Sequence, residues 1–252
     1  MKQFGIQLYS VREEIKNYGL ENVLDVIKAS GFDCVEFAGF YGRTPEEIKK
    51  LLDDRGLKGV SAHIMLNDIE KNLEYIDTVG IERVYVPWES YEDLRDKLPE
   101  IAAKIKEVKE ILDKRGVVFG YHNHSQEYRD DADRVYELME AVPGFTSELD
   151  IFWATAGGHD PVELMRKYGK RLTALHIKEM DKRTNIANPT EYHEAIVGEG
   201  MSNTAAVMEY AKELGIELFV LEVESYPCDY EEYLEKSCAN MKKLAGKYKH
   251  KS

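Results

Sequence analysis

Side chains that bind metal ions or transfer protons occur in pairs, two residues apart, where four apolar segments of the chain end. The pairs are His122 and His124, Glu148 and Asp150, His176 and Lys178, and Glu222 and Glu224. Because successive side chains of a β-strand point to opposite faces, both members of a pair are expected to point the same way. Imidazoles and carboxylates that converge from several strands are typical ligands of a divalent metal ion. The pattern therefore predicts a metal-dependent site.

Other polar residues lie at the ends of earlier apolar segments, namely Gln7, Tyr9, Glu36 and His63. Taken singly, a histidine at a strand end is more often a hydrogen-bonded core residue than a ligand, and a lone glutamate is usually solvated. Four successive segments that each supply a ligand-type side chain favour a metal instead. Coordination removes the cost of burying an unpaired carboxylate.

The donor atoms restrict the choice of metal. Nitrogen and carboxylate oxygen without a thiolate suit Mn²⁺, Co²⁺, Zn²⁺ or Fe²⁺ better than Ca²⁺, and Mn²⁺ is the first expectation. Such an ion polarises a carbonyl and an adjacent hydroxyl, which lowers the barrier to removing the α-proton. A neighbouring carboxylate then serves as the base, and a second group returns or donates a proton. An enzyme is therefore expected.

Strand-like apolar segments alternate with helix-like amphipathic segments along the whole chain. The expected strands span residues 4–9, 34–37, 59–64, 83–86, 117–122, 145–150, 172–178 and 218–223. The expected helices span 20–30, a segment from 44, 68–79, a long charged segment that ends at 115, 132–141, a segment from 159, 204–214 and 230–245. Gly31 suits a helix end, and Thr44 followed by Pro45 suits a helix start.

Eight strand–helix units in 252 residues predict an α/β fold with a single closed (β/α)₈ TIM barrel, one domain over residues 1–252. The alternative is an open doubly wound sheet, which usually has a glycine-rich first turn. The first strand here ends in Gln7-Leu8-Tyr9-Ser10, without such glycines. Residues 181–202 are too long for a simple connection and are expected to form a mobile lid over the site.

The formal net charge is -13 and the pI is about 5.1, which disfavours binding to nucleic acid or to an anionic membrane. Three cysteines, Cys34, Cys228 and Cys238, show no paired spacing and are expected to be reduced thiols, with Cys34 in the core. Neither a signal peptide nor a run of 18 apolar residues is present. These features predict a soluble cytoplasmic protein and leave a homo-oligomer open.

Six segments carry a resemblance to a known family: 5–12 (GIQLYSVR), 35–39 (VEFAG), 121–124 (YHNH), 148–153 (ELDIFW), 175–178 (LHIK) and 198–200 (GEG). Together they resemble the sugar phosphate isomerase/epimerase superfamily of xylose isomerase-like barrels over essentially the whole chain. The resemblance is strongest to the subgroup with a Tyr-His-Asn-His motif, which includes relatives of inosose dehydratase. These motifs are specific for the superfamily and poorly specific for the reaction.

The resemblance implies a set of metal ligands. The superfamily's usual ligands are Glu, Asp, His and Glu from the fifth to the eighth strands, so Asp150, His176 and Glu222 take the last three places. His122 takes the first place, where the epimerases have a glutamate that also acts as acid or base. Glu222 is then the remaining glutamate and the implied base. His124 is an alternative ligand to His122, or a proton donor.

The other candidate residues surround this set. Glu127 is expected to bind substrate or to act as acid or base. Lys178 is expected to stabilise an enolate oxygen, unless it forms a salt bridge to Glu148 or Glu224. Residues expected to bind substrate or to support the ligands are Gln7, Glu36, His63, Glu148 and Trp153. Trp153 suits an apolar wall under a sugar ring and equally suits packing between a loop and the barrel rim.

The leading expectation is a metal-dependent isomerase or epimerase acting beside the carbonyl of a keto-sugar, sugar phosphate or inosose. Loss of the paired glutamate favours a dehydratase or other lyase acting on a keto-sugar, inosose or 3-keto-glycoside as the main alternative. An endonuclease IV-like phosphodiesterase would need a basic face for phosphate contacts, which the acidic composition disfavours. A non-catalytic sugar-binding barrel would not need convergent metal ligands. The expected partner is therefore a small sugar or cyclitol.

Overall fold

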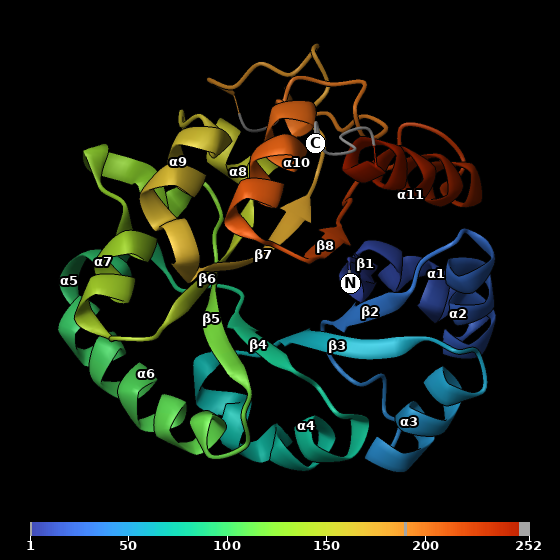
Figure 1. Cartoon of the computed structure of the whole chain (residues 1–252), viewed down its shortest axis with the longest axis horizontal. Coiled ribbons are helices and arrows are strands. Elements are labelled where there is room, and N and C mark those ends of the chain that lie inside the picture. The colour runs from blue at the N-terminus through green and yellow to red at the C-terminus, as the bar shows by residue number, and fades with distance from the viewer. Residues whose placement is uncertain (1, 189–190, 247–252) are drawn as a thin grey trace, which may run out of the picture.

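Eight parallel strands close into a barrel in a computed structural model that describes residues 2–188 and 191–246. Each strand pairs with the next, and β8 pairs with β1 to close the ring. The strands are β1 (Gln3–Gln7), β2 (Cys34–Phe37), β3 (Lys58–His63), β4 (Arg83–Val86), β5 (Val118–His122), β6 (Thr146–Asp150), β7 (Leu172–Ile177) and β8 (Leu218–Leu221). Figure 1 shows the helices outside this ring. The predicted (β/α)₈ barrel is confirmed, and the open sheet is excluded.

The α-helices that cover the barrel are α1 (Arg12–Tyr18), α2 (Leu20–Ala29), α3 (Pro45–Asp53), α4 (Leu73–Val79), α5 (Tyr91–Asp96), α6 (Leu98–Asp113), α7 (Arg134–Ala141), α8 (Ile151–Ala156), α9 (Pro161–Tyr168), α10 (Thr204–Leu214) and α11 (Tyr230–Gly246). Short 3₁₀ helices precede or follow some of them: η1 (Leu8–Val11), η2 (Leu66–Asn72), η3 (Gln126–Asp131) and η4 (Gly169–Arg171). The prediction of one domain over 1–252 stays a prediction.

Local sequence accounts for where several helices begin. The hydroxyl of Thr44 accepts a hydrogen bond from the backbone N–H of Glu47, whose carboxylate accepts one from the Thr44 backbone, and Pro45 occupies the first turn. Asp160 caps α9 in a similar way through the backbone N–H of Val162. These caps start helices where the sequence predicts them.

Apolar side chains fill both the space under the helices and the inside of the barrel. A second buried cluster, distinct from the main core, contains Cys34, Val60, Tyr85, Ala174, Leu218 and Val220. Tyr85 on β4 places its hydroxyl 3.0 Å from that of Thr173 on β7, a strand across the ring. The barrel is therefore a packed core beneath its open end, and the prediction of a core position for Cys34 is confirmed.

Several predicted elements are too long or incomplete. The first strand ends at Gln7 because residues 8–11 turn into a 3₁₀ helix. The seventh ends at Ile177 and the eighth at Leu221, so Lys178 and Glu222 lie just beyond their strands. The expected helix 68–79 is divided into η2 and α4, and the long charged segment that ends at 115 is divided into α5 and α6. The short helices α1 and α8 are not predicted at all. One or two turns carry too few apolar residues to show a helical period.

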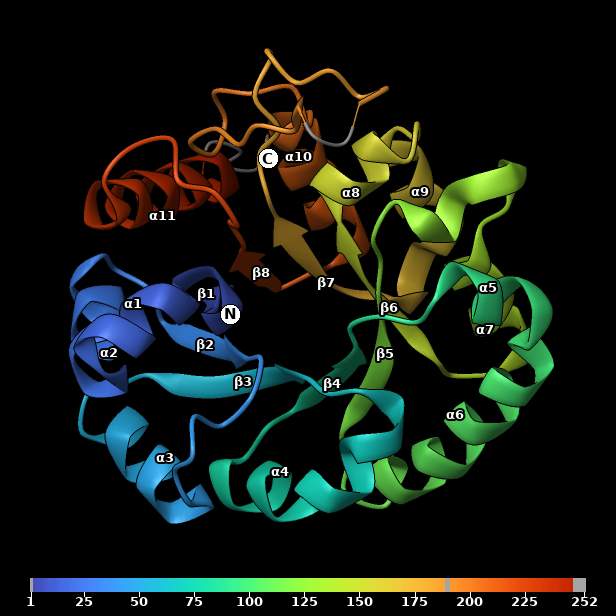
Figure 2. The same ribbon diagram turned by 180° about the vertical axis from the view of Figure 1, so that it is seen from behind.

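The long connection between β7 and α10, yellow to orange in Figures 1 and 2, is fastened at its base. The buried Glu179 carboxylate accepts hydrogen bonds from the backbone of Gly198 (2.8 Å) and Ser202 (2.9 Å) and from the Thr204 hydroxyl (2.5 Å). Met180 forms an isolated β-bridge with Glu194. Residues 189–190 of the expected lid lie outside the described residues. The predicted lid motion stays a prediction, and the anchored base limits it to the outer part of the connection.

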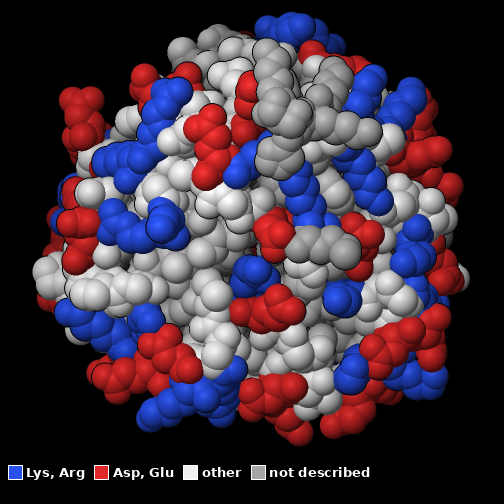
Figure 3. Space-filling model, viewed as in Figure 1, with Lys and Arg blue, Asp and Glu red and all other residues white. Residues whose placement is uncertain are grey.

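Within the described residues, no helix is long and apolar enough to cross a membrane. The three cysteines are free thiols. On the face seen in Figure 3, the described Lys and Arg side chains are interspersed with Asp and Glu, and they form no continuous basic surface there.

Candidate metal centre

Four of the predicted site residues converge at the open end of the barrel. His122 ends β5, Asp150 ends β6, His176 lies in β7, and Glu222 directly follows β8. One ligand atom from each of these four side chains lies within 4.8 Å of the others, and all four residues are buried. We call these residues the ligand cluster. Neighbouring strands of the ring bring them together, as the strand-end pattern predicts.

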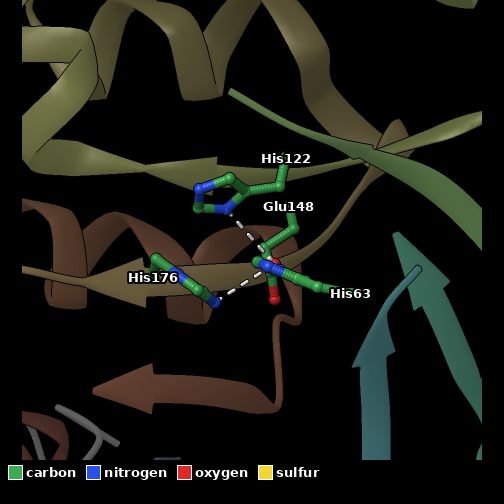
Figure 4. A group of neighbouring side chains, drawn as sticks. All are labelled: His63, His122, Glu148 and His176. Atoms are coloured by element: carbon green, nitrogen blue, oxygen red, sulfur yellow. Dashed lines mark hydrogen bonds and ion pairs between the residues drawn. The ribbon is translucent and has the colours of Figure 1, made fainter. Parts of the chain in front are cut away.

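A second, overlapping group consists of His63, His122, Glu148 and His176. Figure 4 shows three imidazole rings, from β3, β5 and β7, gathered around the carboxylate of Glu148 on β6. Oε2 of Glu148 is 2.7 Å from Nε2 of His63, 3.2 Å from Nε2 of His176 and 3.4 Å from Nδ1 of His122. Glu148 therefore lies on the floor of the site, among the histidines.

His176 connects the two groups through its two ring nitrogens. Nδ1 is 2.5 Å from Oε2 of Glu222 and 3.8 Å from Oδ2 of Asp150. Nε2 is 2.7 Å from Oε1 of Glu36. Burial alone would lower the pKa of His176, but Glu148, Glu36 and Glu222 raise it well above its ordinary value. Glu36 on Nε2 thus orients the ring so that Nδ1 points to Asp150 and Glu222, the two carboxylates of the ligand cluster, as at many metal-binding histidines.

Glu36 is held by three side chains beneath the ligand cluster. It accepts a hydrogen bond from Nε2 of Gln7 at 2.8 Å, and its Oε1 is 3.0 Å from Nε2 of His63. Although burial raises the pKa of Glu36, the neighbouring His63 and His176 hold it well below its ordinary value. Gln7 in turn accepts a hydrogen bond from the backbone N–H of Tyr9. These hydrogen bonds connect Gln7 through Glu36 to Nε2 of His176.

The Tyr-His-Asn-His segment also ties β5 to β6. Asn123 accepts a hydrogen bond from the backbone N–H of Asp150 at 2.9 Å and donates one to its carbonyl at 3.3 Å. Gly120 permits the close approach of the two strands, because a Cβ there would lie 2.7 Å from the Thr146 carbonyl oxygen. Asp150 also caps α8, through Oδ1 and the backbone N–H of Trp153. Local structure therefore fixes the orientation of the Asp150 carboxylate.

Several buried polar atoms of the two groups and of Glu36 have no hydrogen-bond partner. They are Nδ1 of His122, Oδ2 of Asp150, Oε1 of Glu148 and Oε2 of Glu36. Burial raises the pKa of Asp150 to about 8 and, together with the neighbouring Glu36, that of Glu148 to about 7. The raised pKa values show that nearby positive charge does not compensate for the burial of these carboxylates. Orphaned nitrogen and oxygen donors at this spacing fit a divalent cation.

Lys178 lies above the ligand cluster among carboxylates. Its Nζ is 2.5 Å from Oε1 of Glu224, 3.8 Å from Oε1 of Glu222 and 4.0 Å from Oε1 of Glu194. Burial alone would lower the pKa of Lys178, but Glu222, Glu194 and Glu224 raise it. Of the two salt bridges considered as the alternative role of Lys178, the structure forms the one to Glu224, and Glu148 is contacted by histidines instead.

His124 and Glu127 occupy different places relative to the open end. His124 lines the cavity described below, with its ring 5.2 Å from that of Trp153, and burial lowers its pKa to about 4. Glu127 is fully buried and accepts hydrogen bonds from the Tyr121 hydroxyl (2.9 Å) and from the His124 backbone (2.8 Å). It is not among the residues that line the cavity. The structure therefore places Glu127 behind His124.

A cavity of about 420 Å³ opens above the ligand cluster. It is lined by Gln7, Tyr9, Ala38, His63, Met65, Pro87, Trp88, His122, His124, Trp153, Glu222 and Glu224. This volume is within the usual range of small-molecule sites. Of the predicted site residues, Gln7, His63, His122, His124, Trp153 and Glu222 face this space.

Sequence reasoning missed some residues of the site. Glu194 reaches the site from the long connection, and its carboxylate accepts hydrogen bonds from the backbone N–H of Glu224. The sequence of this connection has no hydrophobic periodicity that would mark an inward-facing position. Met65 and Trp88 follow β3 and β4 within loops. Each lies two residues past the end of its strand, and this spacing is the sequence signal that marks them.

The chain belongs to the xylose isomerase-like TIM barrel family, whose model matches residues 24–244. This result confirms the resemblance stated from the sequence motifs.

The names of individual relatives refer to different reactions. The chain is 22% identical over 194 residues to an inosose dehydratase of Geobacillus kaustophilus, a match that covers 65% of this chain and only 63% of that protein. It is 25% identical to a solved sugar phosphate isomerase/epimerase of Parabacteroides distasonis, with a TM-score of 0.74 and coverage of 97% and 94%. The solved IolI protein with a bound zinc atom shares the fold, with a TM-score of 0.76, 16% identity and coverage of 98% and 99%. The relatives therefore include isomerases or epimerases and a dehydratase.

Proposed function

We propose that this protein is a divalent-metal-dependent enzyme of the isomerase or epimerase type, which removes a proton beside the carbonyl of a keto-sugar, sugar phosphate or inosose. The observation that carries the proposal is the convergence of His122, Asp150, His176 and Glu222 beneath an open cavity. The named relatives act in sugar or inosose chemistry, which supports this substrate class.

The ligand cluster would hold the metal, with Mn²⁺ as the first expectation. Zinc is the alternative that the zinc-bound IolI structure supports. When bound, a divalent cation supplies a Lewis acid that stabilises negative charge on a carbonyl oxygen. The overlapping group shares His122 and His176 with the cluster. We assign its other two residues, His63 and Glu148, to holding His176 and the substrate.

Glu222 is the proposed base. Burial alone would raise the pKa of Glu222, but Lys178 and His176 lower it, so the carboxylate is ionised at neutral pH. It lines the cavity and can therefore reach a substrate carbon. Glu222 takes the α-proton, and the C–H bonding electrons form a C=C bond as the carbonyl oxygen becomes negative. Lys178, whose raised pKa keeps it cationic, lies 3.8 Å from Glu222 and pairs with Glu224, and we propose that its charge also stabilises that oxygen.

The second proton distinguishes the candidate reactions. His124 lines the cavity, and its low pKa leaves it neutral at pH 7, able to relay a proton. Lys178 is the second candidate, and Glu127 acts through its hold on His124. Return of the proton to carbon gives an isomer or epimer.

Expulsion of a hydroxyl or an alkoxide group instead gives a dehydratase or lyase. His122 in place of the epimerases' glutamate and the match to an inosose dehydratase favour this alternative. A phosphodiesterase is disfavoured, because none of the described residues that line the cavity is Lys or Arg. We further propose a cytoplasmic location, which suits the free thiols of the three cysteines.

The test is a screen of keto-sugars, inososes and 3-keto-glycosides with Mn²⁺ in D₂O, followed by NMR. The expected result is exchange of one carbon-bound hydrogen, whichever product forms. Glu222→Gln should reduce exchange by roughly a hundredfold or more. Glu199→Gln, at an exposed carboxylate that does not line the cavity, is the matched control, and exchange should persist. Full turnover by Glu222→Gln would contradict the assignment of the base.

A further inference from the structure

Exposed apolar side chains gather at the mouth of the cavity. In the described part of the chain, five large hydrophobic residues are exposed, and three of them, Tyr9 (45%), Met65 (40%) and Trp88 (44%), line this cavity. They follow β1, β3 and β4, and Ala38 and Pro87 lie beside them in the lining. We call the five lining residues Tyr9, Ala38, Met65, Pro87 and Trp88 the apolar wall. Exposed apolar surface in one place indicates a ligand.

The side of the cavity formed after β8 is acidic. Glu222 and Glu224 line it, and Glu194 lies behind them, 4.0 Å from Lys178. Lys178 is already engaged by Glu224. Arg12 is near the apolar wall, but its guanidinium stacks on the Tyr9 ring, 4.0 Å from the ring centroid, and donates a hydrogen bond to the Tyr9 carbonyl. It is not among the lining residues.

A phosphate group is a poor fit to this cavity. None of the described lining residues is Lys or Arg, and the two lining carboxylates would repel a dianion. A divalent cation in the ligand cluster would be neutralised by Asp150 and Glu222. The cavity therefore selects against anionic sugars such as sugar phosphates.

We propose that the substrate is an uncharged glycoside with two rings. The sugar ring that carries the carbonyl lies over the ligand cluster, and the second ring, either another sugar or an aromatic aglycone, stacks on the apolar wall. This assignment rests on the proposed function for the first ring. The second ring is placed by the wall itself, because flat apolar faces of a ring pack well on Trp and Tyr side chains.

Binding measurements test the substrate class separately from turnover. The probes are methyl β-D-glucopyranoside, phenyl β-D-glucopyranoside, cellobiose and glucose 6-phosphate, measured by calorimetry with Mn²⁺ and after chelation. Trp88 and Trp153 are the only tryptophans in the chain and both line the cavity, so tryptophan fluorescence gives a second readout. Phenyl glucoside and cellobiose should bind roughly five- to tenfold more tightly than methyl glucoside, as one stacking contact provides. Glucose 6-phosphate should bind no more tightly than methyl glucoside.

Substitutions locate the second ring. Trp88→Ala should remove the advantage of phenyl glucoside over methyl glucoside, and Trp88→Phe should restore part of it. Tyr18→Ala removes an aromatic side chain that is 59% exposed and does not line the cavity, and it should leave binding unchanged. If Trp88→Ala does not fold, Met65→Ala provides the same comparison.

Equal binding of methyl and phenyl glucosides, absence of binding by every glycoside, or preference for glucose 6-phosphate would each overturn the proposal. Failure of the proposed function would show up instead as absent hydrogen exchange in a protein that retains this binding preference.

Discussion

Asp150 uses its two carboxylate oxygens for two different purposes. Oδ1 caps α8, whereas Oδ2 is buried without a hydrogen-bond partner and faces the ligand cluster. Asp150→Asn keeps a side chain that caps a helix but removes the negative charge. Elemental analysis of wild-type protein purified without chelator should find close to one transition metal per chain. The variant should lose most of this metal.

Two further variants make that measurement specific. Asp160→Asn changes the exposed cap of α9 and should keep its metal. His63→Ala removes a residue of the overlapping group alone and should also keep it. Unchanged metal in Asp150→Asn, or loss only in His63→Ala, would contradict the assigned ligands.

Much of the site is predictable at the level of residues because strand ends bring ligands together. His122, Asp150 and His176 lie in three consecutive strands, so alternation and strand order place them. Glu127 shows the limit of this reasoning. Its distance in sequence from His124 does not reveal whether it faces the cavity or lies behind, since that depends on the turn of η3.

At the level of elements, the strands are predictable to within one or two residues, because buried parallel strands are compact apolar segments. Loops are not predictable in the same way. Glu194 lies 4.0 Å from Lys178, and its pairing with Met180 helps to fix the direction of the long connection there. A pairing between two single residues leaves no periodic signal in the sequence.

The hydrogen bonds of Glu179 should contribute measurably to stability. Glu179→Gln would replace one acceptor oxygen by an NH₂ group that faces backbone N–H donors of Gly198 or Ser202. We expect the free energy of unfolding in urea to fall by roughly 1–3 kcal/mol. The exposed Glu199 on the same connection is the control, and Glu199→Gln should change it by less than about 0.5 kcal/mol. Equal effects of the two substitutions would argue against the anchor.

The outer part of the connection should be the first region that trypsin cleaves. Lys182 and Arg183 are exposed there, beyond the base that Glu179 holds. Mass spectrometry should find the earliest cut after one of these residues, because proteolysis favours exposed loops. A bound keto-sugar should slow this cut if the segment covers the site. Identical rates with and without ligand would be the result that contradicts a lid.

For the whole molecule, metal binding and folding stability should be linked. A metal that binds the folded chain at a concentration a hundredfold above its Kd stabilises by about 2.7 kcal/mol, or roughly 5–10 °C in Tm for a chain of this size. Chelation should therefore lower Tm by that amount, and Mn²⁺ should restore it, measured by scanning calorimetry. The Tm of Asp150→Asn should not respond to either treatment. A response equal to that of the wild type would place the metal elsewhere.

The buried Glu179 also makes the adjoining connection a natural region for engineering. Gly200 is packed so closely that a Cβ would lie 2.0 Å from the Met180 carbonyl oxygen, so the base tolerates little change. Residues 182–188 lie beyond this fixed base, and a change in the length of such a loop adds little to the entropy cost of closing it. A segment transplanted from a relative between these fixed points should therefore leave the scaffold intact, and it would test whether this outer part covers the site.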